Sequence, residues 1–346
     1  MSLRFALIGC GRIGRKHAEF MASSGKVVAV CDTVAEAREE LANKYACKAY
    51  ASVEELIASE QQIDLAAVCT PNGLHAKHSI ALLKAGFHVL CEKPMAIRTR
   101  DCEKMIRTAE EVKKHLFIVK QNRFNPPIAE LKKIIDEGKL GKIFNVQLNC
   151  FWNRNDEYYQ SSSWKGSAEL DGGTLFTQFS HFIDLLYWMV GDVKKAYVMA
   201  GNFTHKNIID FEDTGVIALK FQNGALGTVN YTVNSFGKNM EGSITIFGEK
   251  GTVKVGGQYL NVLEYQNIKD HTMHVAVESK PANDYGFYQG SMSNHDKVYE
   301  NIVQVLQHNG RIATNGDEGL KTVEIIENIY NSLKKKSKAR IAQPVK

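Results

Sequence analysis

The stretch Phe5–Gly14, which reads FALIGCGRIG, decides the fold. It opens with a short apolar run that predicts a buried strand, and the segment Ile13–Met21 has the spacing of an amphipathic helix. A glycine-rich turn between such a strand and helix is typical of a Rossmann dinucleotide-binding fold. In this turn Gly9 permits a tight bend, Gly11 lets a pyrophosphate approach the backbone, and Gly14 lets the helix pack closely on the strand.

A carboxylate follows the second predicted strand. Residues 27–31 are apolar, and Asp32 comes next, at the position where a carboxylate accepts hydrogen bonds from the adenosine ribose hydroxyls. The following residue is Thr33, so a 2′-phosphate meets a repelling charge and no adjacent cation, although Arg12 or Arg38 could fold across. The sequence therefore predicts NAD as the cofactor.

The bulk composition predicts a soluble protein of two domains. The chain has 346 residues, of which 44% are hydrophobic and 23% charged. Its formal charge of +5 is equalled by five cations near the carboxyl end, which are Lys334, Lys335, Lys336, Lys338 and Arg340. We therefore expect a solvated tail and neither a nucleic-acid partner nor a membrane surface as partner.

Cysteine usage and hydropathy predict a cytoplasmic location. All seven cysteines lie within the first 150 residues without a C-x-x-C pair, as expected for reduced, buried thiols. No apolar run approaches the length of a membrane-spanning helix, and the first apolar run lacks a signal-peptide cleavage site.

Strand and helix patterns alternate up to about residue 120 and then change. The first part predicts a doubly wound parallel sheet, in an NAD-binding domain of residues 1–122. The rest, residues 123–346, predicts an α+β domain with an open, mostly antiparallel sheet, for substrate binding and oligomerisation. Asn223-Gly224 predicts a type I′ hairpin there, and the segment 266–292 has no clear period. The predicted helices include 35–45, 74–85, 99–115, 128–137 and 174–190, and helical patterns near 295–306 and 317–333 end the chain. The predicted strands of the second domain are 142–151, 193–201, 215–221, 225–233 and 243–247.

Three polar loops follow strands of the parallel sheet, where ligands of such folds bind. They are Thr70–His75, Glu92–Pro94 and Gln121–Phe124. Pro94 restricts the backbone beside Lys93, so the amine can be aimed at a substrate hydroxyl, to take its proton or to steady the alkoxide. The alternative for Lys93 is a surface lysine paired with Glu92.

The second domain carries its own candidate site in the segment Asp171–Asp184, DGGTLFTQFSHFID. His181 and Asp184 fall on one helix face, where the carboxylate can orient the imidazole. The alternative for His181 is a hydrogen-bonded core residue. The other histidines have no metal-ligand spacing with one another or with cysteine, and we expect no metal.

Together these motifs resemble the Gfo/Idh/MocA oxidoreductases over the full length of the chain. The resemblance implies a dehydrogenase with a Rossmann domain and an open sheet that forms the active-site floor and the subunit contact, in dimers or tetramers. It also implies that Lys93 and His181 flank the reacting carbon as catalytic residues. Many members carry aspartate four residues before this histidine, where the present chain has Thr177. The positions that match the cofactor contacts are Gly9, Gly11, Arg12, Ile13, Gly14, Asp32, Thr70, Pro71, Asn72, His75, Glu92, Lys93, Gln121, Trp164 and Lys165.

A closer likeness is to the dehydrogenases of UDP-N-acetyl-2-amino-2-deoxyglucuronate, which act in bacterial surface-polysaccharide (O-antigen) synthesis. It is carried by Gln121–Pro127, Phe151-Trp152 with Trp164–Gly166, Thr177–His181, Phe211–Gly215 and Met240–Thr245. The likeness implies oxidation of C3 of the uronate sugar by tightly held NAD, with 2-oxoglutarate as a further hydride acceptor in some members. The implied substrate-binding residues are Lys93, Arg123, Arg154, Thr177, Gln178, His181 and Lys238.

Physically, Arg123, Arg154, Lys165 and Lys238 are candidates to neutralise a uronate or phosphate, and the alternative for each is an ordinary exposed cation. Two other functions remain open. One is a dehydrogenase of the same group that acts on a free sugar or inositol, which diphosphate and uronate anchors would distinguish. The other is a non-catalytic protein that senses NAD, against which the presence of both Lys93 and His181 argues.

Overall fold

The computed structural model describes residues 2–275, 281–284, 286 and 288–341, without the side chains of 284 and 334–341. The basic tail therefore lies outside the described side chains. Two compact units emerge, the first made of residues 1–120 with 295–323 and the second of residues 121–294 with 324–346. The domain boundary at residue 122 stays a prediction; the first compact unit contains, in addition, a segment near the carboxyl end.

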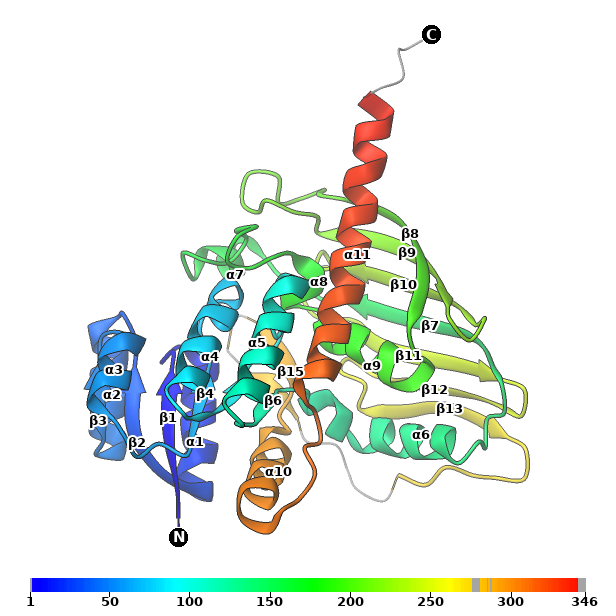
Figure 1. The fold of residues 1–346 in the computed structure, drawn as a ribbon. Coiled ribbons are helices and arrows are strands. Elements are labelled where there is room, and N and C mark those ends of the chain that lie inside the picture. Colours follow the sequence, from blue (N-terminus) through cyan, green and yellow to red (C-terminus); the bar gives the residue numbers. More distant parts are fainter. Residues whose placement is uncertain (1, 276–280, 285, 287, 342–346) are drawn as a thin grey trace. The chain divides into compact units, whose positions relative to one another are not determined.

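The first unit contains a six-stranded parallel sheet with the order β3-β2-β1-β4-β5-β6 (Figure 1). The strands are β1 Leu3–Ile8, β2 Gly25–Cys31, β3 Lys48–Tyr50, β4 Leu65–Val68, β5 His88–Cys91 and β6 Leu116–Ile118. The helices of this unit are α1 Arg12–Ser24, α2 Ala35–Tyr45, α3 Val53–Ser59, α4 His75–Lys84, α5 Thr99–Glu111 and α10 His295–His308. The central strands are buried throughout, as expected where helices cover both faces of a parallel sheet. This sheet confirms the predicted Rossmann fold.

A local signal explains the start of α3 in this unit. The Ser52 hydroxyl caps α3 by accepting from the backbone N–H of Glu55, and the Glu55 carboxylate accepts from the N–H of Ala51. The sequence also predicts that the Thr99 hydroxyl caps α5. This prediction is wrong, because Arg98 holds the N-cap position and Thr99 is the first helical residue. The helix also ends earlier than residue 115, shortly before Lys113 adopts a positive φ of 54°.

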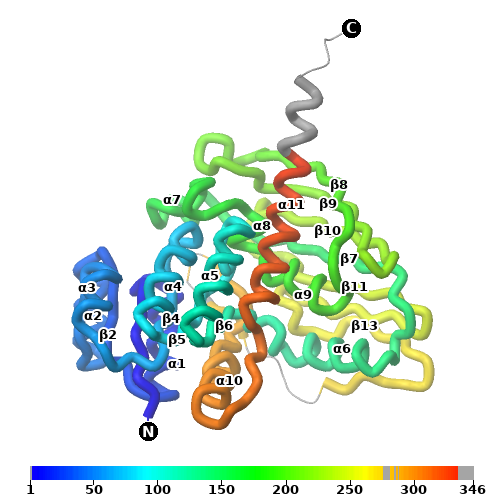
Figure 2. The backbone as a smooth tube through the Cα atoms, in the orientation of Figure 1, coloured from blue at the N-terminus to red at the C-terminus, as the bar shows by residue number. Residues whose placement is uncertain are grey.

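The second unit contains a seven-stranded sheet with the order β13-β12-β11-β7-β10-β9-β8 (Figure 2). Only the pair β7–β10 is parallel, which confirms the predicted open, mostly antiparallel sheet. The strands are β7 Ile143–Phe151, β8 Val193–Gly201, β9 Thr214–Phe221, β10 Leu226–Thr232, β11 Glu241–Gly248, β12 Gly251–Gly256 and β13 Val262–Ile268, with a separate pair β14 Ala282–Asp284 and β15 Gln289–Met292.

The helices of this unit include α6 Pro126–Asp136, α7 Asp156–Gln160, α8 Thr174–Thr177 and α9 Ser180–Val190. The long helix α11 Gly316–Ile341 begins in the first unit and continues in the second. Helix α9 packs against β7 and is buried on nearly every side, because eight of its eleven residues are apolar. Two short 3₁₀ helices, Asn72–Leu74 and Gln121–Phe124, follow β4 and β6.

Two predictions for this unit are wrong in detail. The single helix predicted over 174–190 is interrupted at Gln178 and Phe179, which separate α8 from α9. The turn at Asn223-Gly224 is not type I′, because only Gly224 has a positive φ, of 92°, and that turn requires two such residues. Strands β12 and β13 of this unit were not predicted, nor was β3 of the first unit. No helix among the described residues is long and apolar enough to cross a membrane.

Candidate active site

The glycine turn after β1 has the geometry that a dinucleotide requires. Gly9 has a φ of 97°, and a Cβ there would lie 2.6 Å from the carbonyl oxygen of Cys69. A Cβ on Gly14 would lie 1.9 Å from the carbonyl oxygen of Gly9, so no larger residue fits between helix and turn. By contrast, a Cβ on Gly11 would meet nothing within 4 Å, and no side chain caps the start of α1. The open space before this N-terminus fits a pyrophosphate.

Asp32 is held beside the same turn. One carboxylate oxygen accepts from the backbone N–H of Cys10 at 2.7 Å and the other from that of Val34 at 2.8 Å. Arg38 lies against the backbone, with its guanidinium 3.2 Å from the carbonyl oxygen of Asp32. The carboxylate is thus fixed at the end of β2, where a ribose hydroxyl can donate to it.

His75 joins the loop after β4 to the loop that carries Lys93. Its two ring nitrogens lie 2.7 Å from the carbonyl oxygens of Pro94 and Thr70. Burial lowers the pKa of His75, although both hydrogen bonds oppose this effect. A neutral ring donates to only one of these carbonyls, whereas an imidazolium donates to both. Asn72 is buried in the 3₁₀ helix between them, while Thr70 and Pro71 are half-buried.

Glu92 belongs to a buried cluster that supports the backbone of Lys93. Its carboxylate accepts from the backbone N–H of Lys93 at 2.8 Å and lies 2.9 Å and 3.3 Å from Nε2 of His17 and His295. The Tyr299 hydroxyl lies 2.8 Å from Nδ1 of His17. Burial would raise the pKa of Glu92, but the hydrogen bonds from the two histidines outweigh it and hold the pKa well below its usual value.

One ring nitrogen each of His17 and His295 and one carboxylate oxygen of Glu92 lie within 4.8 Å of one another. This spacing could also hold a metal ion. Hydrogen bonds account for the same spacing, because Tyr299 donates to His17 and both histidines donate to Glu92. The expectation of no metal stays a prediction. The cluster itself was not predicted, since His17 and Tyr299 are 282 residues apart and carry no shared motif.

In the second unit, the ring of His181 lies against the side chain of Gln121. Its Nε2 lies 3.0 Å from the amide nitrogen of Gln121, which also donates to the hydroxyl of Ser291 at 3.0 Å. Asp184 accepts two hydrogen bonds from Arg123, at 2.8 Å and 2.9 Å. That Asp184 orients His181 stays a prediction.

This ion pair also bears on two predicted binding residues. Arg123 is buried in its bidentate pair, and its guanidinium stacks on Trp188, so the geometry favours a structural role for this cation over substrate contact. Gln121 was expected to touch the cofactor, and its observed contacts are to His181 and Ser291. Ligand contacts by either residue stay predictions.

Arg154 is a buried cation of another kind. It is 2% exposed and donates to Gln178 at 2.7 Å and to Asn239 at 3.2 Å. Its guanidinium packs on the rings of Trp152, Tyr158 and Tyr288. Among the side chains that the structure describes, no carboxylate forms an ion pair with it. Burying an uncompensated charge is costly, so this arrangement fits a site whose counter-ion is an anionic ligand.

Further predicted residues surround Arg154. Gln178 donates from its amide to the Tyr158 hydroxyl at 2.7 Å, and Lys165 places its ammonium 3.9 Å from the centre of the Tyr158 ring. Two cations thus contact one aromatic ring. Trp164 is half-buried beside Lys165 in the chain, and Lys238 is exposed in the loop before β11.

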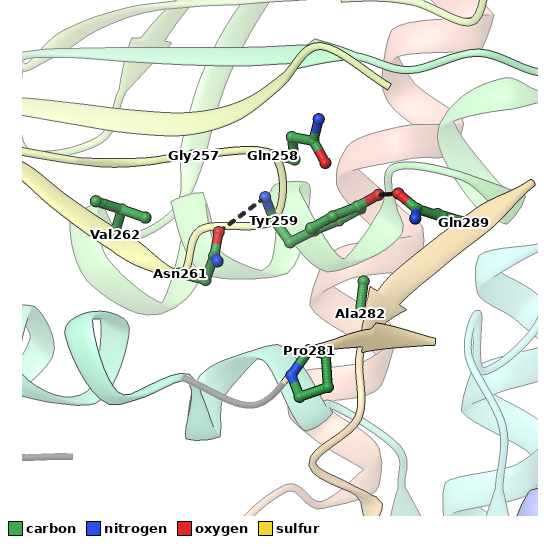
Figure 3. Close-up of a pocket in the computed structure, with 8 residues that line it drawn as sticks. All are labelled: Gly257, Gln258, Tyr259, Asn261, Val262, Pro281, Ala282 and Gln289. Carbon is green, nitrogen blue, oxygen red and sulfur yellow. Dashed lines mark hydrogen bonds between the residues drawn. The ribbon is translucent and has the colours of Figure 1, made fainter. Parts of the chain in front are cut away.

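A cavity of about 370 Å³ lies in the same unit (Figure 3). Tyr259 forms part of its wall and donates its hydroxyl to the side-chain oxygen of Gln289 at 2.7 Å. Asn239 connects this wall to Arg154, because its amide nitrogen lies 3.2 Å from the Tyr259 hydroxyl. The cavity is lined by Gly257, Gln258, Tyr259, Asn261, Val262, Pro281, Ala282 and Gln289.

Comparisons with known proteins agree with this geometry. Residues 3–120 match the Gfo/Idh/MocA model described as an oxidoreductase family with an NAD-binding Rossmann fold, and residues 132–341 match the model of its C-terminal alpha/beta domain.

Two solved structures have a TM-score of 0.87 and 35% identity to this chain. One is the WlbA dehydrogenase of Bordetella pertussis, in which the match covers 97% of both chains. The other is the WlbA dehydrogenase of Chromobacterium violaceum, in which it covers 96% of this chain and 94% of that one. Both are complexes with NADH and UDP-GlcNAcA. The inositol 2-dehydrogenase of Rhizobium meliloti is 23% identical over 356 residues, covering 99% of this chain and 100% of the relative.

Proposed function

The chain belongs to the Gfo/Idh/MocA oxidoreductases and is an NAD-dependent sugar dehydrogenase, and from this premise we propose that it oxidises the C3 hydroxyl of UDP-N-acetylglucosaminuronic acid. The product is the 3-keto sugar nucleotide, an intermediate for surface-polysaccharide sugars. The 35% identity to two dehydrogenases whose complexes contain UDP-GlcNAcA supports this substrate over inositol.

The observation that carries the proposal is the buried, uncompensated guanidinium of Arg154. A substrate with a diphosphate and a carboxylate supplies the missing counter-charge, and a planar guanidinium binds either group through two hydrogen bonds. Lys165 adds a second cation against the same Tyr158 ring. A neutral hexose or inositol would leave the buried charge of Arg154 desolvated and without a counter-ion, which disfavours such substrates.

The cofactor fits the chain's own residues in the first unit. The N–H groups at the start of α1 would hold the pyrophosphate, and Asp32 would accept from the adenosine ribose. When bound, NAD supplies the hydride acceptor. We propose that it stays bound and is renewed in place by 2-oxoglutarate, as the likeness implies.

We assign the chemistry at the reacting hydroxyl to Lys93 and His181, as the family resemblance implies. Glu92 fixes the backbone of Lys93, and the Gln121 amide fixes the ring of His181. Each side chain therefore has a support within its own unit. Positioned groups of this type lower the barrier to proton transfer or steady the developing alkoxide.

Substrate identity is tested by two measurements on the purified protein. Mass spectrometry of the denatured protein detects bound NAD, and turnover is then compared for UDP-N-acetylglucosaminuronic acid, UDP-N-acetylglucosamine, glucose and myo-inositol, with and without 2-oxoglutarate. We expect the uronate to be used at least about 100-fold more efficiently than UDP-N-acetylglucosamine, the scale of a lost contact of roughly 3 kcal/mol. Equal efficiency for these two, or a preference for a free polyol, would overturn the proposed substrate. A protein that binds NAD but turns over none of these would support the NAD-sensing function instead.

The role of Arg154 is tested by Arg154→Met, which keeps a long apolar stem. We expect this variant to lose most of its preference for the uronate while its NAD content is unchanged. The matched control is Lys220→Met, which removes an exposed cation on β9 of the same unit. If Arg154→Met keeps the wild-type preference, Arg154 does not bind the anion.

We also propose that the protein forms a dimer or tetramer through the open face of the seven-stranded sheet. Five exposed apolar side chains lie there, on β8 (Tyr197, Met199), β9 (Val216), β10 (Leu226) and β13 (Tyr265). Such a patch is unusual on a monomer. Light scattering of the wild type and of Met199→Lys tests this, and a monomeric wild type would refute it.

A further inference from the structure

Asp171 is a buried acid to which no role has been assigned so far. It is 1% exposed and directly precedes the two glycines before α8. One carboxylate oxygen accepts from the backbone N–H of Gly166 at 2.9 Å. The other accepts from the hydroxyl of Thr177, which also lies 3.2 Å from the carbonyl oxygen of Asp171. Its side chain is therefore tied to the last residue of α8.

Thr177 connects this buried carboxylate to the segment that carries the candidate site. It is half-buried, whereas Asp171 is fully buried. Gln178, which binds Arg154, is the next residue, and His181 follows four positions after Thr177. A hydroxyl that donates to a carboxylate can still accept a proton through its lone pairs.

The surroundings of Asp171 make it a ready proton acceptor near neutral pH. Burial raises its pKa to about 6, although the hydrogen bonds from Thr177 and Gly166, the charge of Lys165 and the N–H of Gly173 oppose this rise. Among the described residues, the titratable groups near it include Lys165 and, from α7, Tyr158 and Tyr159. Burial raises the pKa of both tyrosines, so neither competes for the proton.

We propose that Asp171, acting through the Thr177 hydroxyl, receives the proton that leaves the substrate hydroxyl during oxidation. This inference rests on the proposed dehydrogenase function. The substrate O–H bond breaks and its proton passes to Oγ1 of Thr177, whose own proton passes to the Asp171 carboxylate. The hydride from the same carbon passes to NAD, so the alcohol becomes a ketone and one proton is stored on Asp171. Lys93 and His181 then steady the alkoxide as hydrogen-bond donors. Asp171 is a positioning residue, since Thr177 is the group in contact with the substrate.

The test compares single-turnover NAD reduction across pH for variants of both residues, on whichever sugar substrate the wild type oxidises. We expect Asp171→Asn and Thr177→Val to slow the step by about 100-fold, as for the loss of a positioned acid-base group. Thr177→Ser keeps the hydroxyl and should retain most of the rate. The wild-type rate should fall as the pH drops below about 6, where Asp171 is protonated, and Asp171→Asn should lack this fall. The matched control is Asp210→Asn, an exposed acid that accepts from Ala168 in the same loop as Gly166.

A carboxylate transplant separates proton transfer from structural support. The double variant Asp171→Asn/Thr177→Asp moves the acid to position 177, and we expect its rate to exceed that of Asp171→Asn by at least tenfold. A purely structural role predicts no such recovery. If Asp171→Asn does not fold, the contrast between Thr177→Val and Thr177→Ser still decides the role of the hydroxyl.

A second readout does not depend on turnover. Infrared difference spectra between the wild type and Asp171→Asn should show a carboxylic acid band that titrates near pH 6. An unchanged rate and pH profile in Asp171→Asn, or a band that is absent at all pH values, would overturn this inference. Failure of the proposed function would appear separately, as a wild type that oxidises no sugar.

Discussion

Glu212 provides a test of the electrostatics of the second unit through the change Glu212→Gln. Its carboxylate is 8% exposed and accepts from the hydroxyls of Tyr231 at 3.0 Å and Tyr330 at 2.8 Å. Burial raises the pKa of Glu212 to about 7 from a usual 4.5, although both tyrosine hydroxyls oppose the rise. Glutamine keeps an oxygen that can accept from both hydroxyls but cannot ionise.

The size of the effect follows from the difference in proton binding between folded and unfolded chains. The rise in the pKa of Glu212 from 4.5 to about 7 corresponds to about 3 kcal/mol of folding free energy. The raised pKa stabilises the protonated folded form, so this contribution is fully present below about pH 4.5 and is lost as the pH rises through about 7. Relative to the glutamine variant, the wild type should therefore lose about 3 kcal/mol of stability across that window.

The assay is denaturant unfolding of the wild type and the glutamine variant at a series of pH values. The difference between their free energies of unfolding isolates the contribution of Glu212 from other titrating groups. Glu169→Gln, at an exposed position in the same unit, is the matched control and should show no such trend. The reasoning is refuted if the difference for Glu212→Gln is independent of pH or grows in favour of the wild type as the pH rises.

Three further changes test the cofactor site and the two candidate catalytic groups. Asp32→Ala should weaken the binding of NAD relative to NADP, because the variant can neither accept from the ribose hydroxyls nor repel the 2′-phosphate. Calorimetry that finds equal affinities of the wild type for NAD and NADP would contradict the assignment. Lys93→Met and His181→Asn should each lower the single-turnover rate by a factor of roughly 10² to 10⁴. The two losses should not add in the double variant, because both residues act on one oxygen. A wild-type rate in either single variant would remove that residue from the mechanism. Asp184→Asn should destabilise the protein by about 3 kcal/mol in denaturant unfolding, because Arg123 stays buried without its counter-charge, and an unchanged stability would show that the pair contributes little.

Periodicity and turn chemistry were sufficient for elements with a clear sequence pattern in both units. The helix predicted over Ala35–Tyr45 and the strand predicted over Val193–Gly201 have the observed bounds, because their apolar spacing and flanking residues agree with each other. Strand β3 has only three residues, of which one is buried, and this pattern is too short to be recognised in the sequence. Strand β13 is mostly exposed and lacks a clear alternation, so its pairing with β12 decides its structure.

In the candidate site, residues placed by local spacing could be predicted, whereas contacts between residues far apart in the sequence could not. The glycine turn and Asp32 could be predicted because a fixed spacing places them. The partner of Asp184 could not, because the helical spacing that suggested His181 allows several neighbours and Arg123 lies 61 residues away. Asp171 was part of a recognised motif, but its bond to Thr177 depends on the break between α8 and α9.

The composition of the first unit determines when it can be completed during synthesis. A nascent chain that has emerged as far as residue 120 has His17 and Glu92, but Tyr299 and His295 are still missing. At ribosomal speeds the intervening residues 121–294 take roughly 10 to 35 s to make. During that time the face of α1 that later contacts α10 remains uncovered and open to chaperones. The amino-terminal unit can therefore complete its fold only after residues 121–294 of the second unit have been synthesised.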